Sequence, residues 1–252
     1  MPDVHFITFA NTGYISTNRI CAQARSFGLF TSVKGWNETD IPDYIQKHAE
    51  FIKTWPGGYG RFIWKPKIIY DKLVSMKDGD ILLYCDAGCH LNVNGLTRFA
   101  DYLHMFDTKD VLAFLTSDIH KLQYFVKKDA IMSYYPELHG QAHQYMYAGV
   151  VFVKKTPSSM TMIHDWLMLC QTYNFLDESP SVHYKEPPYF NGQDTDNGLF
   201  AMCVYKFLPV VQFIDPTEVN VYFPDGRQHY NCTDWSSLDS FPIQYRRDRP
   251  PR

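Results

Sequence analysis

The sequence predicts an α/β fold, in which one mostly parallel sheet is flanked by helices in a single domain. Strand-like and helix-like segments alternate along the chain, an order typical of parallel strands joined by helical crossovers. Residues 81–85 (ILLYC) form a short apolar run bounded by Gly79 and Gly88, which indicates a strand covered on both faces. With 252 residues, 45% of them hydrophobic, the chain is long enough to bury one large core.

The predicted elements follow from local signals. Residues 4–10 (VHFITFA) predict a first strand, and Ser16 or Thr17 can cap the helix after it. Pro42 and Pro66 each suit the first turn of a helix. The other strands are expected at residues 29–33, 81–85, 111–116, 145–153 and 210–214, and the other helices at residues 42–52, 62–76, 156–170 and 194–207.

Two segments rich in glycine or proline interrupt this pattern. Residues 55–60 hold three glycines in four positions, and residues 177–192 form a longer proline-rich stretch. Both lie between elements of one continuous pattern. We therefore interpret them as loops at a functional site rather than as linkers between domains.

Composition excludes some partners and suggests others. The net charge of −3 and the pI near 6.3 give no general attraction to nucleic acid or to an anionic membrane. No run of eighteen apolar residues or signal-peptide pattern occurs, and the six cysteines are scattered, so we expect a soluble, cytoplasmic protein. The aromatic content of 16% suits stacking on sugar rings or bases, or simply an aromatic-rich core.

One acid stands out by its position. Asp86 directly follows the predicted strand 81–85, and ligands of open α/β sheets bind just outside the carboxyl ends of the strands. The alternative is that Asp86 only caps the turn. The chain contains no dinucleotide fingerprint, no P-loop and no His-Glu-x-x-His motif, so Asp86 is the starting point for a site.

Several phrases of the chain occur in the same order in a known group of enzymes. They are GYGRFIWKPKIIYDKL with GDILLYCDAGC, then YAGVVFVKKT, and then NGQDTDNGLFAM. Over roughly residues 4–215 the chain resembles viral and bacterial glycosyltransferases of the GT-A fold. The resemblance implies a GT-A-like, Rossmann-like sheet, with a nucleotide-sugar-binding part at about residues 1–118 and an acceptor-binding part at about residues 119–252.

The resemblance implies a donor site at the strand ends. It places the base and ribose beside Thr8, Phe9 and Ala10, with Arg19 near the nucleotide, although Phe9 can equally pack in the core. Lys65 suits the diphosphate because a cation beside a helix amino terminus reinforces the positive end of the dipole. The remaining residues expected to bind the donor are Arg61, which would fold over the phosphates, and Asp86, Ala87 and Gly88.

The resemblance also implies a divalent metal, Mn or Mg. GT-A enzymes hold it with a strand-end Asp-x-Asp, and here Asp86 matches the first acid while Gly88 replaces the last. Hard cations prefer several oxygen ligands. Asp86 is therefore expected to hold the ion with donor phosphates, waters and a tail residue such as His229, or else to orient the ribose.

Catalysis is assigned to the start of the late helix. Asp196 matches the acid of the family's His-Asp-Gln-Ser motif, and we expect it to take the proton of an acceptor hydroxyl in an inverting displacement. Asp194 competes for this role and is otherwise the helix cap. The residues expected to contact the acceptor or the transferred sugar are Ala148 and Gly149, which would leave room for the sugar, and the rings of Trp64 and Tyr189.

The sequence thus predicts transfer of a monosaccharide from a nucleotide-sugar to a glycan or other hydroxyl acceptor. Two alternatives stay open. A glycoside hydrolase also uses acids at strand ends and would act on a free oligosaccharide without a nucleotide. A non-catalytic sugar-binding or nucleotide-binding module would bind the nucleotide without transfer.

Overall fold

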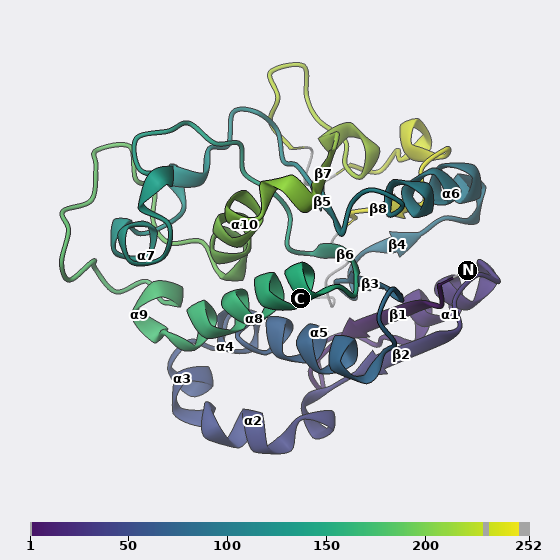
Figure 1. The fold of residues 1–252 in the computed structure, drawn as a ribbon, viewed down its shortest axis with the longest axis horizontal. Helices are drawn as coiled ribbons and strands as arrows, with labels where there is room; N and C mark the ends of the chain where they lie inside the picture. The colour runs from purple at the N-terminus through teal and green to yellow at the C-terminus, as the bar shows by residue number, and fades with distance from the viewer. Residues whose placement is uncertain (1, 229–231, 247–252) are drawn as a thin grey trace.

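Strands and helices alternate along most of the chain, which the computed structural model describes for residues 2–228 and 232–246 (Figure 1). The strands are β1 (Val4–Phe9), β2 (Ser32–Trp36), β3 (Ile81–Cys85), β4 (His90–Leu91), β5 (Val111–Phe114), β6 (Val150–Lys154), β7 (Val211–Ile214) and β8 (Ile243–Gln244). The helices are α1 (Asn18–Ser26), α2 (Pro42–Lys47), α3 (Ala49–Thr54), α4 (Gly58–Arg61), α5 (Trp64–Ser75), α6 (Leu96–Met105), α7 (Lys128–Tyr134), α8 (Pro157–Gln171), α9 (Tyr173–Leu176) and α10 (Asp196–Lys206).

Six of the strands form the central sheet, in the order β2-β1-β3-β6-β5-β7. β1 pairs in parallel with β2 and with β3, and β5 pairs in parallel with β7. β6 runs antiparallel to both of its neighbours, so its amino end lies beside the carboxyl end of β3. The predicted class, a mostly parallel sheet flanked by helices, is confirmed, and the reversal of β6 decides what lies next to Asp86.

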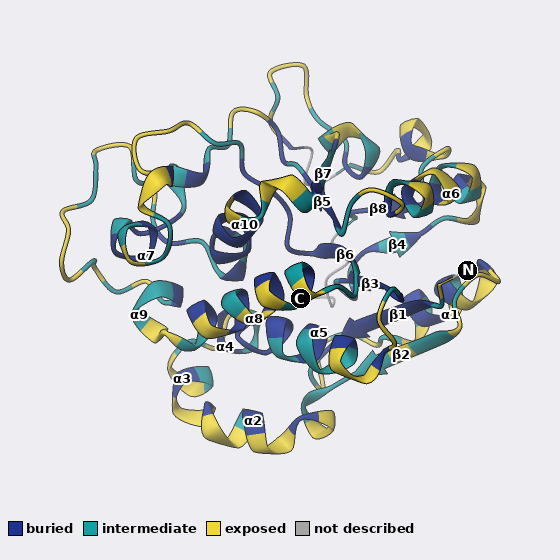
Figure 2. Ribbon diagram, in the orientation of Figure 1, coloured by how far each residue is buried: buried dark blue, intermediate teal, exposed yellow. Residues whose placement is uncertain are grey.

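The sheet is covered on both faces, and the inner strands β1 and β3 are buried along their whole length (Figure 2). Alternate residues of β3 serve the two cores: Leu82 and Tyr84 join the core under α5, α8 and α10, whereas Leu83 and Cys85 join the core under α1 and α6. The short β4–β8 ribbon extends this second core. The continuous apolar run 81–85 is therefore explained by burial on both faces.

Two predicted helices begin where their sequence signals place them. α8 starts after Thr156, whose side chain accepts a hydrogen bond from the Ser159 backbone, while Ser159 reciprocates in a capping box. α5 starts at Trp64 and has Pro66 in its first turn. In both cases the signal lies within a few neighbouring residues, which is why the sequence alone sufficed.

Three predicted elements differ from the structure. The second strand is shifted to Ser32–Trp36, and the helix expected over residues 42–52 divides at His48 into α2 and α3. The strand expected over residues 145–153 enters the sheet only at Val150. The residues before Val150 lie outside the regular β5–β6 pairing. One of them, Tyr147, donates its backbone N–H to the Phe114 carbonyl at the end of β5.

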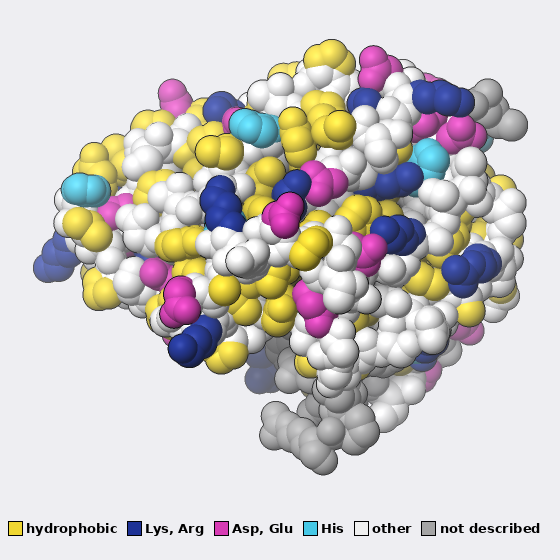
Figure 3. All heavy atoms as spheres, turned by 90° about the horizontal axis from the view of Figure 1, so that it is seen from below, with side chains coloured by type: hydrophobic (Ala, Val, Ile, Leu, Met, Phe, Trp, Pro, Cys, Tyr) yellow, Lys and Arg dark blue, Asp and Glu magenta, His cyan; other side chains and the backbone are white. Residues whose placement is uncertain are grey.

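None of the helices within residues 2–228 and 232–246 combines the length and the apolar composition that a membrane span requires. On the face seen in Figure 3, acidic and basic side chains are interspersed with hydrophobic ones. That face has no broad area of a single sign of charge, in keeping with the nearly balanced composition.

Candidate active site

A cleft of about 1230 Å³ opens at the edge of the sheet where β1 and β3 end. Its lining comes from the residues after β1, the segment from α4 into the start of α5, the turn after β3, the residues between β5 and β6, the loop before α10, and three residues near the carboxyl end, which are Tyr222, Gln228 and Tyr245. Pockets for one small ligand usually measure about 300 to 1,000 Å³. The cleft is therefore larger than a pocket for one small ligand usually is.

Asp86 lines this cleft, and its carboxylate is held on one side. Its Oδ1 accepts a hydrogen bond of 2.6 Å from the Tyr84 hydroxyl and lies 3.2 Å from the Lys65 ammonium. Its backbone N–H donates to the Gly149 carbonyl, which precedes the reversed strand β6. The Asp86 side chain keeps 28% of its surface exposed, so this acid can still meet a ligand.

Lys65 bridges two acids from distant parts of the chain. Its ammonium lies 3.0 Å from Oδ2 of Asp196, at the start of α10, and 3.2 Å from Asp86. The Lys65 side chain is 2% exposed. Burial alone would lower the pKa of Lys65, but the carboxylates of Asp196 and Asp86 raise it, so the ammonium stays charged. The expected diphosphate contact of Lys65 would thus compete with two carboxylates.

Asp196 is the most deeply placed acid of the site. It lines the cleft, yet its side chain is only 1% exposed and neither oxygen has a hydrogen-bond partner beyond the ion pair with Lys65. Burial raises the pKa of Asp196 to about 6, an effect that Lys65 opposes. In this structure Asp196 is the buried counter-ion of Lys65 in the wall of the cleft.

Asp194 is the more accessible acid of the pair. Its Oδ2 accepts a 2.7 Å hydrogen bond from the Tyr145 hydroxyl, and its Oδ1 accepts one from the Thr195 backbone. Asp194 does not cap α10, because the cap position is occupied by Thr195. The cap expected at Asp194 is therefore wrong, and the base expected at Asp196 lies at a side chain that is 1% exposed.

The structure brings together nine of the residues that the sequence singled out. Those that line the cleft are Phe9, Ala10, Trp64, Lys65, Asp86, Ala87, Gly88, Asp194 and Asp196. Thr8 is fully buried beside them. His229, the second expected metal ligand, lies outside the described residues.

Two arginines have structural contacts instead of a place in the cleft lining. Arg19 donates to the backbone carbonyls of Ala87 and Cys89 and so holds the turn after β3. Arg61 is buried and donates to the carbonyls of Leu176 and Gln193. Both guanidinium groups are thus engaged by carbonyl oxygens of the chain in this structure.

The residues expected around the transferred sugar are also placed differently. Ala148 is fully buried, and a Cβ on Gly149 would lie 2.4 Å from the Tyr245 hydroxyl and 2.7 Å from Oδ2 of Asp86. Gly149 therefore makes room for Tyr245 and Asp86. Trp64 is 4% exposed and stacks on Phe9 with ring centroids 3.8 Å apart.

Tyr189 is 43% exposed but does not line the cleft, and its ring lies 5.9 Å from that of Tyr124. The ring platform expected at Tyr189 is therefore not among the residues that line the cleft.

Several lining residues were missed by sequence reasoning. They follow β5 or precede α10 and are Thr116, Ser117, His120, Phe125, Lys127, Tyr145 and Phe190. β5 is parallel to β3, because both run antiparallel to β6, so the residues after β5 reach the same edge of the sheet as Asp86. Burial lowers the pKa of His120, which keeps its ring neutral and able to accept a proton. The sequence signal that could have found these residues was the end of the predicted strand near Phe114, because residues that follow a parallel strand are expected at the binding edge of the sheet.

The charges of the cleft suit a cation brought with the donor. Four carboxylates and two lysines line it, and both lysines are already paired with acids. No cluster of three or more His, Cys, Asp or Glu side chains suited to a metal occurs within the described part of the chain. Asp86 is the one lining acid at a strand end with an exposed oxygen, so it would be the described ligand of such an ion, with the donor phosphates supplying others.

No family profile and no curated protein sequence matches this chain. Among solved structures, a glycosyltransferase involved in the glycosylation of the major capsid of PBCV-1 aligns with a TM-score of 0.46 and 12% identity, covering 96% of this chain and 94% of that one. Apo mouse xyloside xylosyltransferase 1 aligns with a TM-score of 0.46 and 9% identity, covering 96% and 97%. At these values neither likeness bears on the substrate or the reaction.

Proposed function

We propose that the protein is a glycosyltransferase that moves a monosaccharide from a nucleotide-sugar to a hydroxyl acceptor. The observation that carries this proposal is the placement of Asp86: a partly exposed carboxylate at the end of a buried strand, fixed by Tyr84 and Lys65 in the lining of a large cleft. The motifs that resemble GT-A glycosyltransferases meet around this residue.

The donor is expected to lie over Asp86 and the turn Ala87-Gly88, where Gly88 lets a phosphate approach the backbone. A divalent ion bound there would neutralise charge on the departing diphosphate. Within the chain, Tyr84 and Lys65 hold Asp86 in one orientation, and burial raises the pKa of Tyr84 far enough to keep its hydroxyl a donor.

The acceptor is expected to lie toward Asp194. In a single inverting displacement, the acceptor oxygen forms the new bond to the anomeric carbon and its proton passes to the Asp194 carboxylate. The bond from that carbon to the diphosphate breaks, and its electron pair leaves with the nucleoside diphosphate. We assign the proton to Asp194 rather than to Asp196, because Asp196 has almost no accessible surface.

Ligand binding tests the donor site. We would measure the melting temperature with a panel of nucleoside diphosphates and nucleotide-sugars, each with and without Mn²⁺. A donor at 100 times its Kd stabilises the folded state by about 2.7 kcal/mol, which is roughly 5 to 10 °C for a chain of this size. Asp86→Ala should abolish the shift. Asp78→Ala, at the exposed turn before the same strand, is the matched control and should retain it.

The outcomes separate the proposal from its alternatives. A shift together with sugar transfer supports a transferase. A shift without transfer to any acceptor supports a binding module, and cleavage of a free oligosaccharide without nucleotide supports a glycoside hydrolase. A full shift in Asp86→Ala would remove this acid from the donor site.

Turnover tests the acceptor site. Asp194→Asn should keep donor binding and lose about 10²- to 10⁴-fold in kcat, the usual contribution of a general base. Asp196→Asn, which makes the same change two residues away, is the comparison variant. If Asp196→Asn loses turnover by that factor while Asp194→Asn does not, the proton is taken by Asp196 as the sequence motif suggested.

A further inference from the structure

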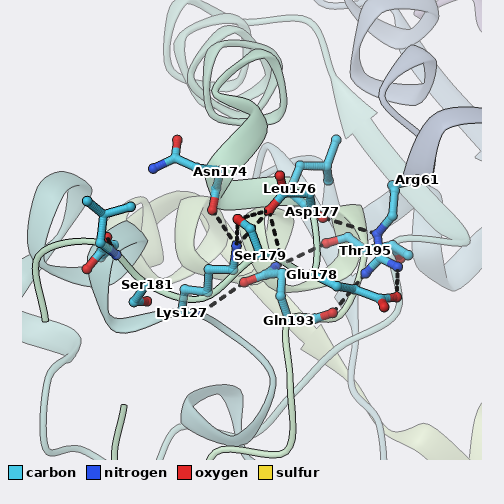
Figure 4. A network of polar contacts seen from close by, with 12 residues as sticks. Arg61, Lys127, Asn174, Leu176, Asp177, Glu178, Ser179, Ser181, Gln193 and Thr195 are labelled. Atoms are coloured by element: carbon cyan, nitrogen blue, oxygen red, sulfur yellow. Dashed lines mark hydrogen bonds and ion pairs between the residues drawn. The ribbon is translucent and has the colours of Figure 1, made fainter. Parts of the chain in front are cut away.

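The loop before α10 is closed at its neck by one buried side chain. Arg61 donates from Nε to the carbonyl of Leu176 and from an amino group to the carbonyl of Gln193, at 3.1 and 2.8 Å. It also forms an ion pair with Glu178 (Figure 4). The two carbonyls lie at opposite ends of residues 177–192, so the guanidinium ties together the ends of a compact surface loop of the Ω type.

The backbone around Arg61 is arranged to deliver this side chain. Tyr59, Arg61 and Phe62 have φ angles of 54°, 55° and 63°, in the left-handed region that non-glycine residues seldom adopt. Such conformations cost of order 1 kcal/mol or more each and persist only where the surroundings impose them. From this backbone the Arg61 side chain, only 9% exposed, contacts Leu176, Glu178 and Gln193.

Two further buried charges hold the body of the loop. The ammonium of Lys127 bonds the Asn174 carbonyl, Asp177 and the Ser179 hydroxyl (Figure 4). Asp129 accepts hydrogen bonds from the backbone N–H groups of residues 182–184. Both side chains are about 1% exposed, and each is satisfied mainly by the loop, so the loop is fixed along its length.

The clamped loop forms one wall of the cleft with both of its ends. Residues 178–180 line the cleft from the near end, and residues 190–194 line it from the far end. The far end carries Asp194, one residue after the Gln193 carbonyl that Arg61 holds. A shift of the neck would therefore displace the acid assigned to proton transfer.

We infer that Arg61 is a positioning residue for the acceptor half of the reaction. It acts through the loop, by setting where Asp194 and the acceptor-facing wall stand, and it does not bind the donor phosphates. The inference rests on the proposed function. It differs from the sequence-based expectation, in which Arg61 folds over the diphosphate.

The test separates acceptor kinetics from donor binding. Arg61→Lys keeps a positive charge but cannot bridge both carbonyls, and Arg61→Met removes the fork while keeping the length of the stem. Misplacement of a catalytic group by about 1 Å can cost roughly 10²-fold. We expect kcat/KM for the acceptor to fall by about that factor in Arg61→Met and by less in Arg61→Lys. The Kd of the nucleoside diphosphate should stay within about twofold.

Arg98→Met is the matched control. Arg98 forms a two-pronged ion pair with Glu218 on the opposite side of the sheet, so its loss removes a comparable structural contact without touching the loop. This control should keep the acceptor kcat/KM. Proteolytic cleavage within residues 177–192 should accelerate in the Arg61 variants and not in Arg98→Met.

Each outcome has one meaning. A parallel loss of donor affinity in Arg61→Lys would overturn the inference and restore a phosphate contact. Unchanged acceptor kinetics in an active enzyme would overturn it while leaving the proposed function intact. If the wild-type protein transfers no sugar from any donor, the proposed function fails and the positioning role fails with it.

Discussion

Lys65 offers a quantitative test of the buried charges at the centre of the site. Its ammonium has two carboxylate partners, Asp196 at 3.0 Å and Asp86 at 3.2 Å, and is itself 2% exposed. Lys65→Met keeps most of the side-chain volume but leaves Asp196 buried with no cation. Removing one partner of a buried pair typically costs about 3 to 5 kcal/mol, a large share of the roughly 5 to 15 kcal/mol that folds a domain.

Asp196→Asn is expected not to destabilise the fold. Lys65 keeps Asp86 as a partner in this variant, and no buried negative charge remains at position 196. The double variant Lys65→Met/Asp196→Asn also leaves no buried charge at position 196, and the Asp86 carboxylate, which is 28% exposed, keeps the hydrogen bond from Tyr84. It should therefore be more stable than Lys65→Met alone by about 2 to 3 kcal/mol, which is the coupling energy of residues in direct contact.

The free energies of unfolding of the wild type, the two single variants and the double variant are measured by urea unfolding at pH 7.5. They can be compared through the unfolding midpoints as long as the m-value is the same for all four proteins. A matched pair lies on the same helix: Lys67 and Asp71 are 2.6 Å apart and about 30% exposed, so their coupling should be only about 0.3 to 0.5 kcal/mol. If Lys65→Met costs no more than Lys67→Met, or if the Lys65 and Asp196 changes are additive, the buried bridge is not the stabilising contact that its geometry indicates.

Three further predictions concern neighbouring groups. Burial raises the native pKa of Asp196 to about 6, so between pH 4 and 6 the folded state holds more protons than the unfolded state, and this residue lowers the free energy of unfolding by roughly 3 kcal/mol as the pH rises. The free energies of unfolding of wild type and Asp196→Asn should therefore diverge over that pH window. Parallel pH profiles of the two proteins would contradict the raised pKa. Gly149→Ala should lower the free energy of unfolding by about 1 to 3 kcal/mol and weaken nucleotide binding, because the new Cβ displaces Tyr245 and the Asp86 carboxylate. An unchanged melting temperature and Kd would show that Gly149 does not pack tightly against these two side chains. Asp129→Asn should lower the free energy of unfolding by about 1.5 to 3 kcal/mol, because it weakens the three hydrogen bonds that the carboxylate accepts from the backbone. Proteolysis near residue 183 should also become faster. Stability and cleavage equal to those of the wild type would exclude a role of Asp129 in holding the loop.

The correct sequence-based predictions all rested on local patterns. The strand 81–85 with Asp86 at its end, the helix that Pro66 opens and the capping box at Thr156 all depend on residues a few positions apart. These signals were enough to predict the fold class and to place an acid in the lining of a cleft. The motifs on either side of Asp86 also indicated that Lys65 and the start of α10 belong to the same site.

The roles of individual side chains depended on contacts that no local pattern records. The sequence by itself determined an α/β sheet with an acid at a strand end, because the burial of a strand and the capping of a helix are encoded in neighbouring residues. Only the tertiary structure decided that β6 runs backwards and brings Gly149 against Asp86, and that Arg61 bonds carbonyls 115 and 132 residues further along the chain. Lys65 is likewise enclosed between Asp86 and Asp196 only once the helices pack on the sheet, and that enclosure turns an apparent phosphate ligand into the partner of two acids.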